Sequence, residues 1–188
     1  MILRGIGKLA CGNAKGIDEF SATPEGFTAS LAPLIAFPLV GAVATGLSGH
    51  WKVAVIGLLS RLCAVLVLPV ITYEFSRLFG RQDRWLRTAT ALNWCFWLVL
   101  PAVLVAAVLG SVAVQFALSM PRVEVGVLAL VGLYLLWNRW FILKSGLNIN
   151  GWRAVVILLA SLLITAVISC LPIIAGLPLT GVDAAPLP

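Results

Sequence analysis

The sequence predicts an all-α, polytopic membrane protein: a bundle of five transmembrane helices preceded by a segment that can form an interfacial helix. Of its 188 residues, 61% are hydrophobic and only 11% are charged, which is more apolar surface than a soluble domain of this size can bury. Five apolar stretches follow one another, each close to the about 20 residues that a helix needs to cross the hydrocarbon. They span residues 30–47, 53–73, 92–118, 123–143 and 155–177.

These stretches leave no room for a separate soluble domain. Residues 1–29 are predicted to form an N-terminal cytoplasmic or interfacial segment, residues 30–177 the five-helix transmembrane domain, and residues 178–188 a short external tail. Residues 1–20 place apolar side chains at roughly helical spacing with basic residues between them, as in a helix lying in the interface. Their four glycines cost about 1 kcal/mol each in a helix, so a partly ordered tail is the alternative. The glycines also interrupt the apolar core that a cleaved signal peptide needs.

A helix start precedes the first apolar stretch. Thr23 suits the N-cap, Pro24 suits the first helical position, and Glu25 meets the positive end of the helix. Farther along this stretch, Ala42-x-x-x-Gly46 predicts the close approach of a neighbouring helix.

The third and fifth stretches carry further packing signals. Pro101 removes a backbone donor and predicts a kink just inside the membrane. Ala106-x-x-x-Gly110 predicts a second close-packing face. The hydroxyls of Ser161 and Thr165 are expected to bond the preceding turn or a neighbouring helix.

Arg61 lies well inside the second stretch, where a central arginine costs about 2.5–3.5 kcal/mol. Its side chain leans toward the start of its helix, which here is the nearer interface, so Arg61 can snorkel outward. We expect it to pair with Glu124, or failing that with Gln115, in the outer half of the membrane. A role in binding a substrate or ion is the alternative.

Segment 75–91 is basic. Its arginines alternate with apolar residues, which predicts an interfacial helix or hairpin facing anionic lipid headgroups, with about 1 kcal/mol for each arginine near the surface. A topology signal without a specific ligand is the alternative. The expected headgroup contacts are Arg77, Arg81, Arg84 and Arg87.

A second polar group is expected at the inner side, where Glu74, Asn93, Asn138 and Arg139 can form a cluster. Glu74 can pair with Arg77 or Arg139. We interpret this cluster first as polar groups that satisfy helix ends and second as a binding site.

The basic residues give the orientation. Ten of the 13 Lys and Arg residues fall on the N-terminal side of the membrane, two fall on the other side, and Arg61 lies within it. Positively charged loops stay in the cytoplasm. The N-terminus is therefore predicted to be cytoplasmic and the C-terminus external or periplasmic, in a bacterial inner membrane. On this basis the net charge of +6 reflects topology and lipid contact, and no nucleic-acid partner is expected.

No reaction is indicated by the residues. There is no positioned His or carboxylate pair for acid–base work, and the four cysteines and His50 show no metal-ligand spacing. We therefore expect no enzyme activity, no catalytic residue, no cofactor and no metal.

Residues 25–177 resemble the Yip-type five-span integral membrane protein family, which includes uncharacterised bacterial members. The resemblance rests on five spans, an inside N-terminus, an outside C-terminus, a basic cytoplasmic face and short outer loops. The Asp-Leu-Tyr-Gly-Pro stretch of the eukaryotic members is absent, so their interaction with Rab GTPases is not carried over. The resemblance implies a non-enzymatic membrane protein that packs with itself, with lipids or with other membrane proteins.

Three functions compete on these grounds. The first is a structural, accessory or assembly component whose partners are the anionic bilayer and other membrane proteins or a second copy. The alternative is a small transporter or channel that uses Arg61 in an outer-half polar site, a role that the prolines within the spans also favour. The third is an enzyme acting on lipid, which would need convergent polar groups around Glu74, Asn93 and Asn138.

Overall fold

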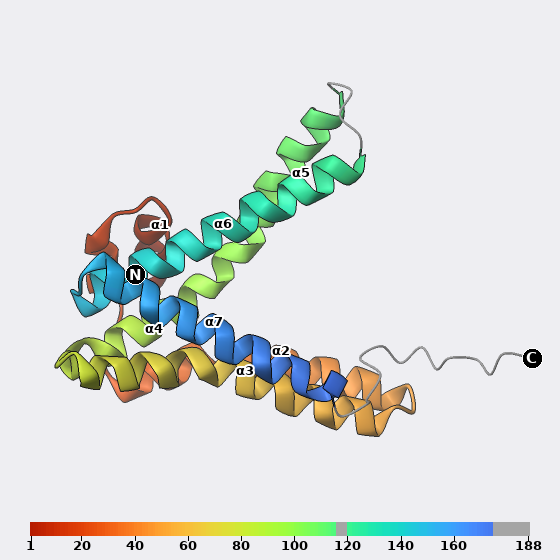
Figure 1. The fold of residues 1–188 in the computed structure, drawn as a ribbon, viewed down its shortest axis with the longest axis horizontal. Helices are drawn as coiled ribbons and strands as arrows, with labels where there is room; N and C mark the ends of the chain where they lie inside the picture. Colours follow the sequence, from red (N-terminus) through yellow and green to blue (C-terminus); the bar gives the residue numbers. More distant parts are fainter. Residues whose placement is uncertain (116–119, 175–188) are drawn as a thin grey trace, which may run out of the picture.

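The computed structural model describes residues 1–115 and 120–174, with side chains described for residues 1–112 and 120–170. Every regular element in these ranges is a helix (Figure 1), so the predicted all-α fold is confirmed. The elements in chain order are α1 Ile2–Ala10, the 3₁₀ helix η1 Ala14–Glu19, α2 Pro24–Leu47, α3 Trp51–Leu78, η2 Gln82–Arg84, α4 Trp85–Cys95, η3 Phe96–Leu98, α5 Val99–Gln115, α6 Met120–Leu147 and α7 Gly151–Ile174.

Five helical runs in the described part of the chain are long and apolar enough to cross a membrane, so this is a multi-pass membrane protein. The helices extend beyond several predicted stretches because helical hydrogen bonding continues into polar sequence that hydropathy does not detect. The five runs are Pro24–Leu47, Trp51–Leu78, Gln82–Val112, Met120–Leu147 and Gly151–Cys170.

The start of α2 is built as the sequence predicts. The Thr23 hydroxyl accepts a hydrogen bond from the backbone N–H of Gly26 at 3.2 Å, and Pro24 occupies the first turn. This satisfies one of the free donors at the helix end. The helix then continues to Leu47 through both of its internal prolines.

The third run is interrupted where Pro101 requires it. Pro101 has no N–H, so the carbonyl of Trp97 loses its α-helical donor. The chain winds as the 3₁₀ helix η3 over Phe96–Leu98, which separates α4 from α5. The α-helix is thus interrupted close to the place where Pro101 predicts a kink, and both halves of the run pack against α6.

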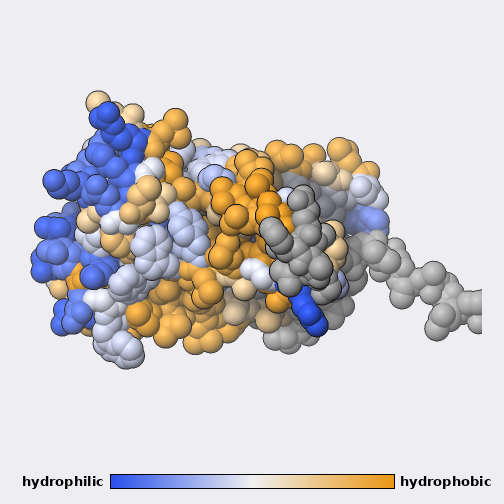
Figure 2. All heavy atoms as spheres, turned by 90° about the horizontal axis from the view of Figure 1, so that it is seen from above, coloured by the Kyte–Doolittle hydropathy of each residue, from blue (hydrophilic) through white to orange (hydrophobic). Residues whose placement is uncertain are grey.

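The buried core lies at one end of the molecule. We call this the basic end: it holds α1, η1, the α3–α4 turn and the α6–α7 turn. Hydrophilic side chains gather there, at the left of Figure 2, and apolar side chains cover the middle. Beneath this polar surface, α6 and α7 contribute five side chains with 0% exposure: Ile142, Leu143, Leu147, Ala154 and Ile157.

The N-terminal segment docks onto this core. Asn138 Nδ2 donates to the Leu9 carbonyl and Tyr134 Oη donates to the Ala10 carbonyl, both at 3.1 Å. These bonds satisfy carbonyls at the end of α1 that have no donor within the helix. Leu9 itself is fully buried, whereas Leu3 is 84% exposed. The structure therefore favours a helix over a loosely ordered tail, with one end fixed to the bundle and an apolar tip left uncovered.

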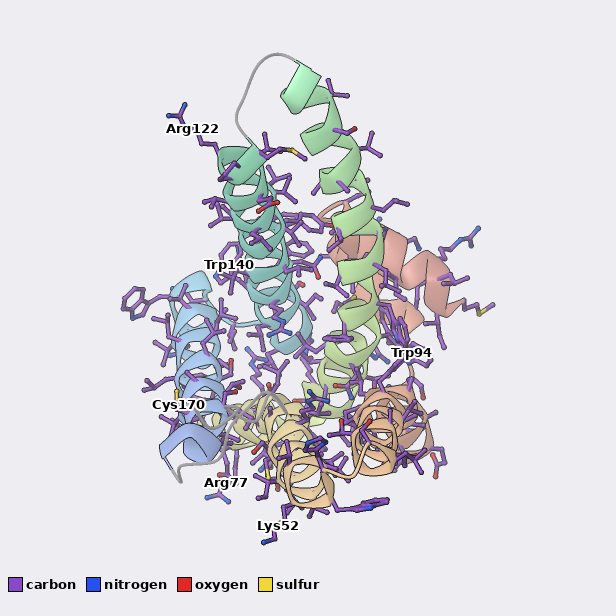
Figure 3. All side chains as sticks on the ribbon, turned by 90° about the vertical axis from the view of Figure 1, so that its right-hand side faces the viewer. Lys52, Arg77, Trp94, Arg122, Trp140 and Cys170 are labelled. Carbon is purple, nitrogen blue, oxygen red and sulfur yellow. The ribbon has the colours of Figure 1, made fainter. Side chains whose placement is uncertain are left out.

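Away from the basic end the helices form two diverging arms (Figure 1). The hairpin arm comprises α5 and residues 120–135 of α6, and the three-helix arm comprises α2, α3 and α7. Figure 3 shows Arg122 and Lys52 at the outer tips of the two arms, far apart in that view. The predicted close-packing face holds the hairpin arm together: Ala106 is 1% exposed, and a Cβ at Gly110 would lie 3.0 Å from Val127.

Candidate functional site

A cavity of about 220 Å³ lies where the two arms meet. Helices α2, α3, α4, α6 and α7 and the 3₁₀ turn η3 all contribute to its wall, so its shape depends on the whole fold. Most of the lining is apolar, with four polar side chains among it. The lining residues are Leu34, Ala64, Val65, Leu68, Leu92, Asn93, Phe96, Arg139, Ser161, Leu162 and Thr165.

Two of the polar side chains are held by short hydrogen bonds. Asn93 Nδ2 donates to Ser30 Oγ at 2.9 Å, which ties α4 to α2. The Ser161 hydroxyl donates to the Leu158 carbonyl at 2.7 Å, within its own helix, as predicted for this residue. Both side chains are buried. Their positions are fixed because a buried polar group that lost its partner would cost about 1–3 kcal/mol.

Arg139 is the charged group of the cavity. It is half-buried, and no carboxylate of the described residues lies within ion-pair distance of its guanidinium. Over the same part of the chain, no fully buried side-chain nitrogen or oxygen lacks a hydrogen-bond partner. The guanidinium nitrogens, for which no hydrogen bond is found, are therefore not fully buried, and Arg139 is one of the residues that line the cavity. The site offers a positive charge among apolar walls.

The predicted inner-face cluster is divided by the fold. Asn93 and Arg139 share the cavity. Asn138, one residue before Arg139, faces a different side of α6 and bonds α1. Glu74 is exposed and pairs with Arg77 at 3.7 Å, one helical turn away. Of its two predicted partners, Glu74 therefore takes Arg77 and not Arg139.

The predicted pairing of Arg61 with Glu124 is wrong. Arg61 lies on the three-helix arm, where its Nη1 would be 3.2 Å from a Cβ at Gly41 of α2. Glu124 lies near the tip of the hairpin arm, and no ion pair joins the two residues. The prediction failed because hydropathy gives depth in the membrane but not the separation of the arms. The side chain of Gln115, the second predicted partner, lies outside the described residues.

The arginines of segment 75–91 lie on a hairpin formed by the end of α3, the turn through η2 and the start of α4. Arg84 pairs with Asp83 at 3.8 Å. Arg87 reaches Asp18 of η1 at 3.2 Å, which ties this hairpin to the N-terminal segment. Arg81 is half-buried and Arg77 is exposed. Their contact with lipid headgroups stays a prediction.

A further ion pair closes the N-terminal segment. Lys8 on α1 bonds Glu19 at the end of η1. The hydrogen bond from the Lys8 ammonium group holds the pKa of Glu19 below its usual value of 4.5. A favourable interaction with the charged form of an acid lowers its pKa in this way.

Two residues were not predicted from the sequence as part of this site. Thr165 lines the cavity, and Ser30, which is not among the lining residues, supports it as the partner of Asn93. The spacing of Ser161 and Thr165, one turn apart on α7, was the available signal because it places two hydroxyls on one helix face. In the described ranges, no three His, Cys, Asp or Glu residues gather in a group that could hold a metal ion.

No protein-family model, curated protein or solved structure matches this chain. The predicted resemblance to Yip-type proteins therefore stays a prediction.

Proposed function

We propose that this chain is a non-enzymatic accessory or assembly component of a bacterial inner membrane, which holds a transmembrane helix of another membrane protein between its two arms. Its N-terminus would be cytoplasmic and its C-terminus periplasmic. This orientation is supported by the hydrophilic side chains gathered at the basic end (Figure 2) and by the tendency of basic loops to stay in the cytoplasm.

The observation that carries the proposal is a pair of glycines, one on each arm. Gly132 on α6 lies two turns before Arg139, and Gly57 on α3 lies two turns before Ala64. Residues seven apart share a helix face, so each glycine lies on the same face as a residue of the cavity. The faces of the two arms that meet at the cavity therefore continue outward through Gly57 and Gly132.

These two glycines differ from those that the chain uses for its own packing. A Cβ at Gly57 or Gly132 would meet no atom within 4 Å, whereas one at Gly110 would meet Val127 at 3.0 Å. Helices in lipid associate through small residues that let their backbones approach closely. A helix of another protein seated between the arms would pack against these two open positions.

The test is extraction of the tagged protein from native membranes in mild detergent, followed by mass spectrometry of the proteins that remain bound. A stoichiometric membrane protein is expected with the wild type. The double variant Gly57→Leu/Gly132→Leu should lose it, while Leu104→Phe should retain it because Leu104 is 67% exposed and lies on the far side of α5 from Ala106. Recovery of the wild type alone or as a homo-oligomer would contradict the proposal.

The alternative of a transporter that uses Arg61 has less support. Arg61 is separated from Glu124 and is absent from the lining of the cavity, so the outer-half polar site is not assembled by these two residues.

A further inference from the structure

We infer that the cavity at the meeting point of the arms binds the acidic headgroup of a phospholipid from the membrane leaflet that faces the basic end. The inference goes beyond the proposed function, because it assigns a ligand to the inner part of the space between the arms, whereas the partner helix would occupy the outer part.

The cavity carries a positive charge that is not balanced. Arg139 presents a guanidinium that no described carboxylate neutralises, at a cavity whose wall has no acidic residue. Charged residues within membrane helices are costly unless they are paired or hydrated. An anion bound at Arg139 would supply the missing charge, and guanidinium groups bind phosphate through paired, charge-assisted hydrogen bonds.

Nearby tryptophans indicate the depth of the cavity in the membrane. Four tryptophans lie within two residues of a cavity-lining residue in the sequence: Trp94, Trp97, Trp137 and Trp140. Tryptophan is enriched at the level of the lipid headgroups, so Arg139 and Asn93 are expected at that level and not at the centre of the bilayer. The Lys144 ammonium group, 5.1 Å from the centroid of the Trp140 ring, marks the polar edge of the same zone.

The wall of the cavity is mostly apolar. Seven of the 11 lining residues are apolar, and they come from α2, α3, α4, η3 and α7. A volume of about 220 Å³ is several times the share of one water molecule, which is about 30 Å³. It has room for a phosphate and the first carbons attached to it. A free inorganic anion would make no favourable contact with the apolar wall. In the phosphate end of a lipid, by contrast, the phosphate can bind the polar side chains while the attached carbons contact the apolar residues.

The hydroxyl of Thr165 completes the ligand set. Thr165 lines the cavity one turn beyond Ser161, and no hydrogen bond of its hydroxyl is found within the described residues. The Ser161 hydroxyl is already engaged with Leu158, so the donors left for a bound phosphate are those of Thr165 and Arg139 and the second N–H of Asn93 Nδ2, whose first N–H bonds Ser30.

The experiment is native mass spectrometry of the purified full-length protein with added phosphatidylglycerol or phosphatidylcholine. Phosphatidylglycerol should bind in preference. Arg139→Gln should weaken its binding about tenfold, the size of one charge-assisted hydrogen bond. The matched control is Arg4→Gln, which removes an exposed arginine of α1 at the same end of the molecule and should change binding less than about threefold, as for a screened surface charge.

Thr165→Leu gives a second reading that does not depend on the charged residue, because it removes the hydroxyl and fills the cavity. It should also reduce phosphatidylglycerol binding, and this variant decides the question if Arg139→Gln fails to fold. Equal losses in Arg139→Gln and Arg4→Gln would overturn the inference in favour of general surface attraction. Equal binding of the two lipids, or competition by inorganic phosphate at the same concentration as the lipid, would overturn it as well.

Discussion

The basic end and the two arms are built from the same helices but packed in different ways. At the basic end, α6 buries Ile142, Leu143 and Leu147 completely, and donors from α6 fix the N-terminal segment. Along the hairpin arm, the same helix leaves Leu128 72% exposed and packs mainly on α5. In lipid, apolar exposure carries no penalty, so an open arm can persist only because a closed end holds the helices together. The comparison indicates that stability resides at the basic end, whereas the space between the arms is where we propose that binding occurs.

The sharpest way to break this comparison is to substitute one glycine of α6 at the basic end and one within the hairpin arm. A Cβ at Gly146 would lie 2.5 Å from Thr88 Oγ1 and 2.8 Å from its Cγ2, so Gly146→Ala should destabilise the protein by about 1–3 kcal/mol through overpacking. Gly132→Ala has open space and should be neutral or stabilise the helix by up to about 1 kcal/mol. Thermal unfolding in detergent measures the stability of both variants. Equal effects of the two substitutions would contradict the claim that stability resides at the basic end.

A smaller effect is expected where the N-terminal segment docks. Asn138→Leu removes the side-chain donor to the Leu9 carbonyl. That carbonyl keeps the backbone N–H of Gly12 at 3.0 Å, so the cost is that of one hydrogen bond, about 0.5–1.5 kcal/mol. Amide hydrogen exchange should rise through residues 2–20. Tyr134→Phe removes the less buried bond to Ala10 and should raise exchange less. An unchanged exchange pattern in Asn138→Leu would show that packing alone holds α1.

The smallest effect concerns the ion pair between Lys8 and Glu19. Because the pKa of Glu19 is lowered in the folded protein, its contribution to stability is present above pH 4.5, its usual pKa, and is lost as the pH falls through the lowered value. When the pH is lowered from 6 to 3, a range that includes the usual pKa of 4.5, the unfolding temperature should therefore drop slightly more in the wild type than in Glu19→Gln. Identical pH profiles of the two proteins would show that the ion pair does not contribute to stability.

Much of the fold could be predicted from the sequence because local signals govern it. The N-cap at Thr23, the interruption before Pro101 and the close packing at Gly110 each depend on residues within a few turns of one another. The existence of five apolar helices followed from composition and length alone.

The candidate site could not be predicted in the same way because it depends on how distant helices are placed. Arg61 and Glu124 lie at similar predicted depths, yet they belong to different arms. Arg139 and Asn138 are adjacent in sequence and were assigned to one cluster, but successive residues on a helix point about 100° apart. Asn138 therefore bonds α1 while Arg139 lines the cavity. The separation of the arms is a property of the packed basic end, which no single stretch of sequence encodes.

The most direct test of the account is the distance between the tips of the two arms in a lipid bilayer. This distance can be measured by electron paramagnetic resonance between spin labels at Lys52→Cys and Arg122→Cys. The four native cysteines are first replaced. A control pair at Leu47→Cys and Lys52→Cys stays within the three-helix arm. The account predicts a clearly longer distance for the pair that joins the arms than for the control. Equal short distances, close to the about 8–10 Å between packed helices, would contradict it.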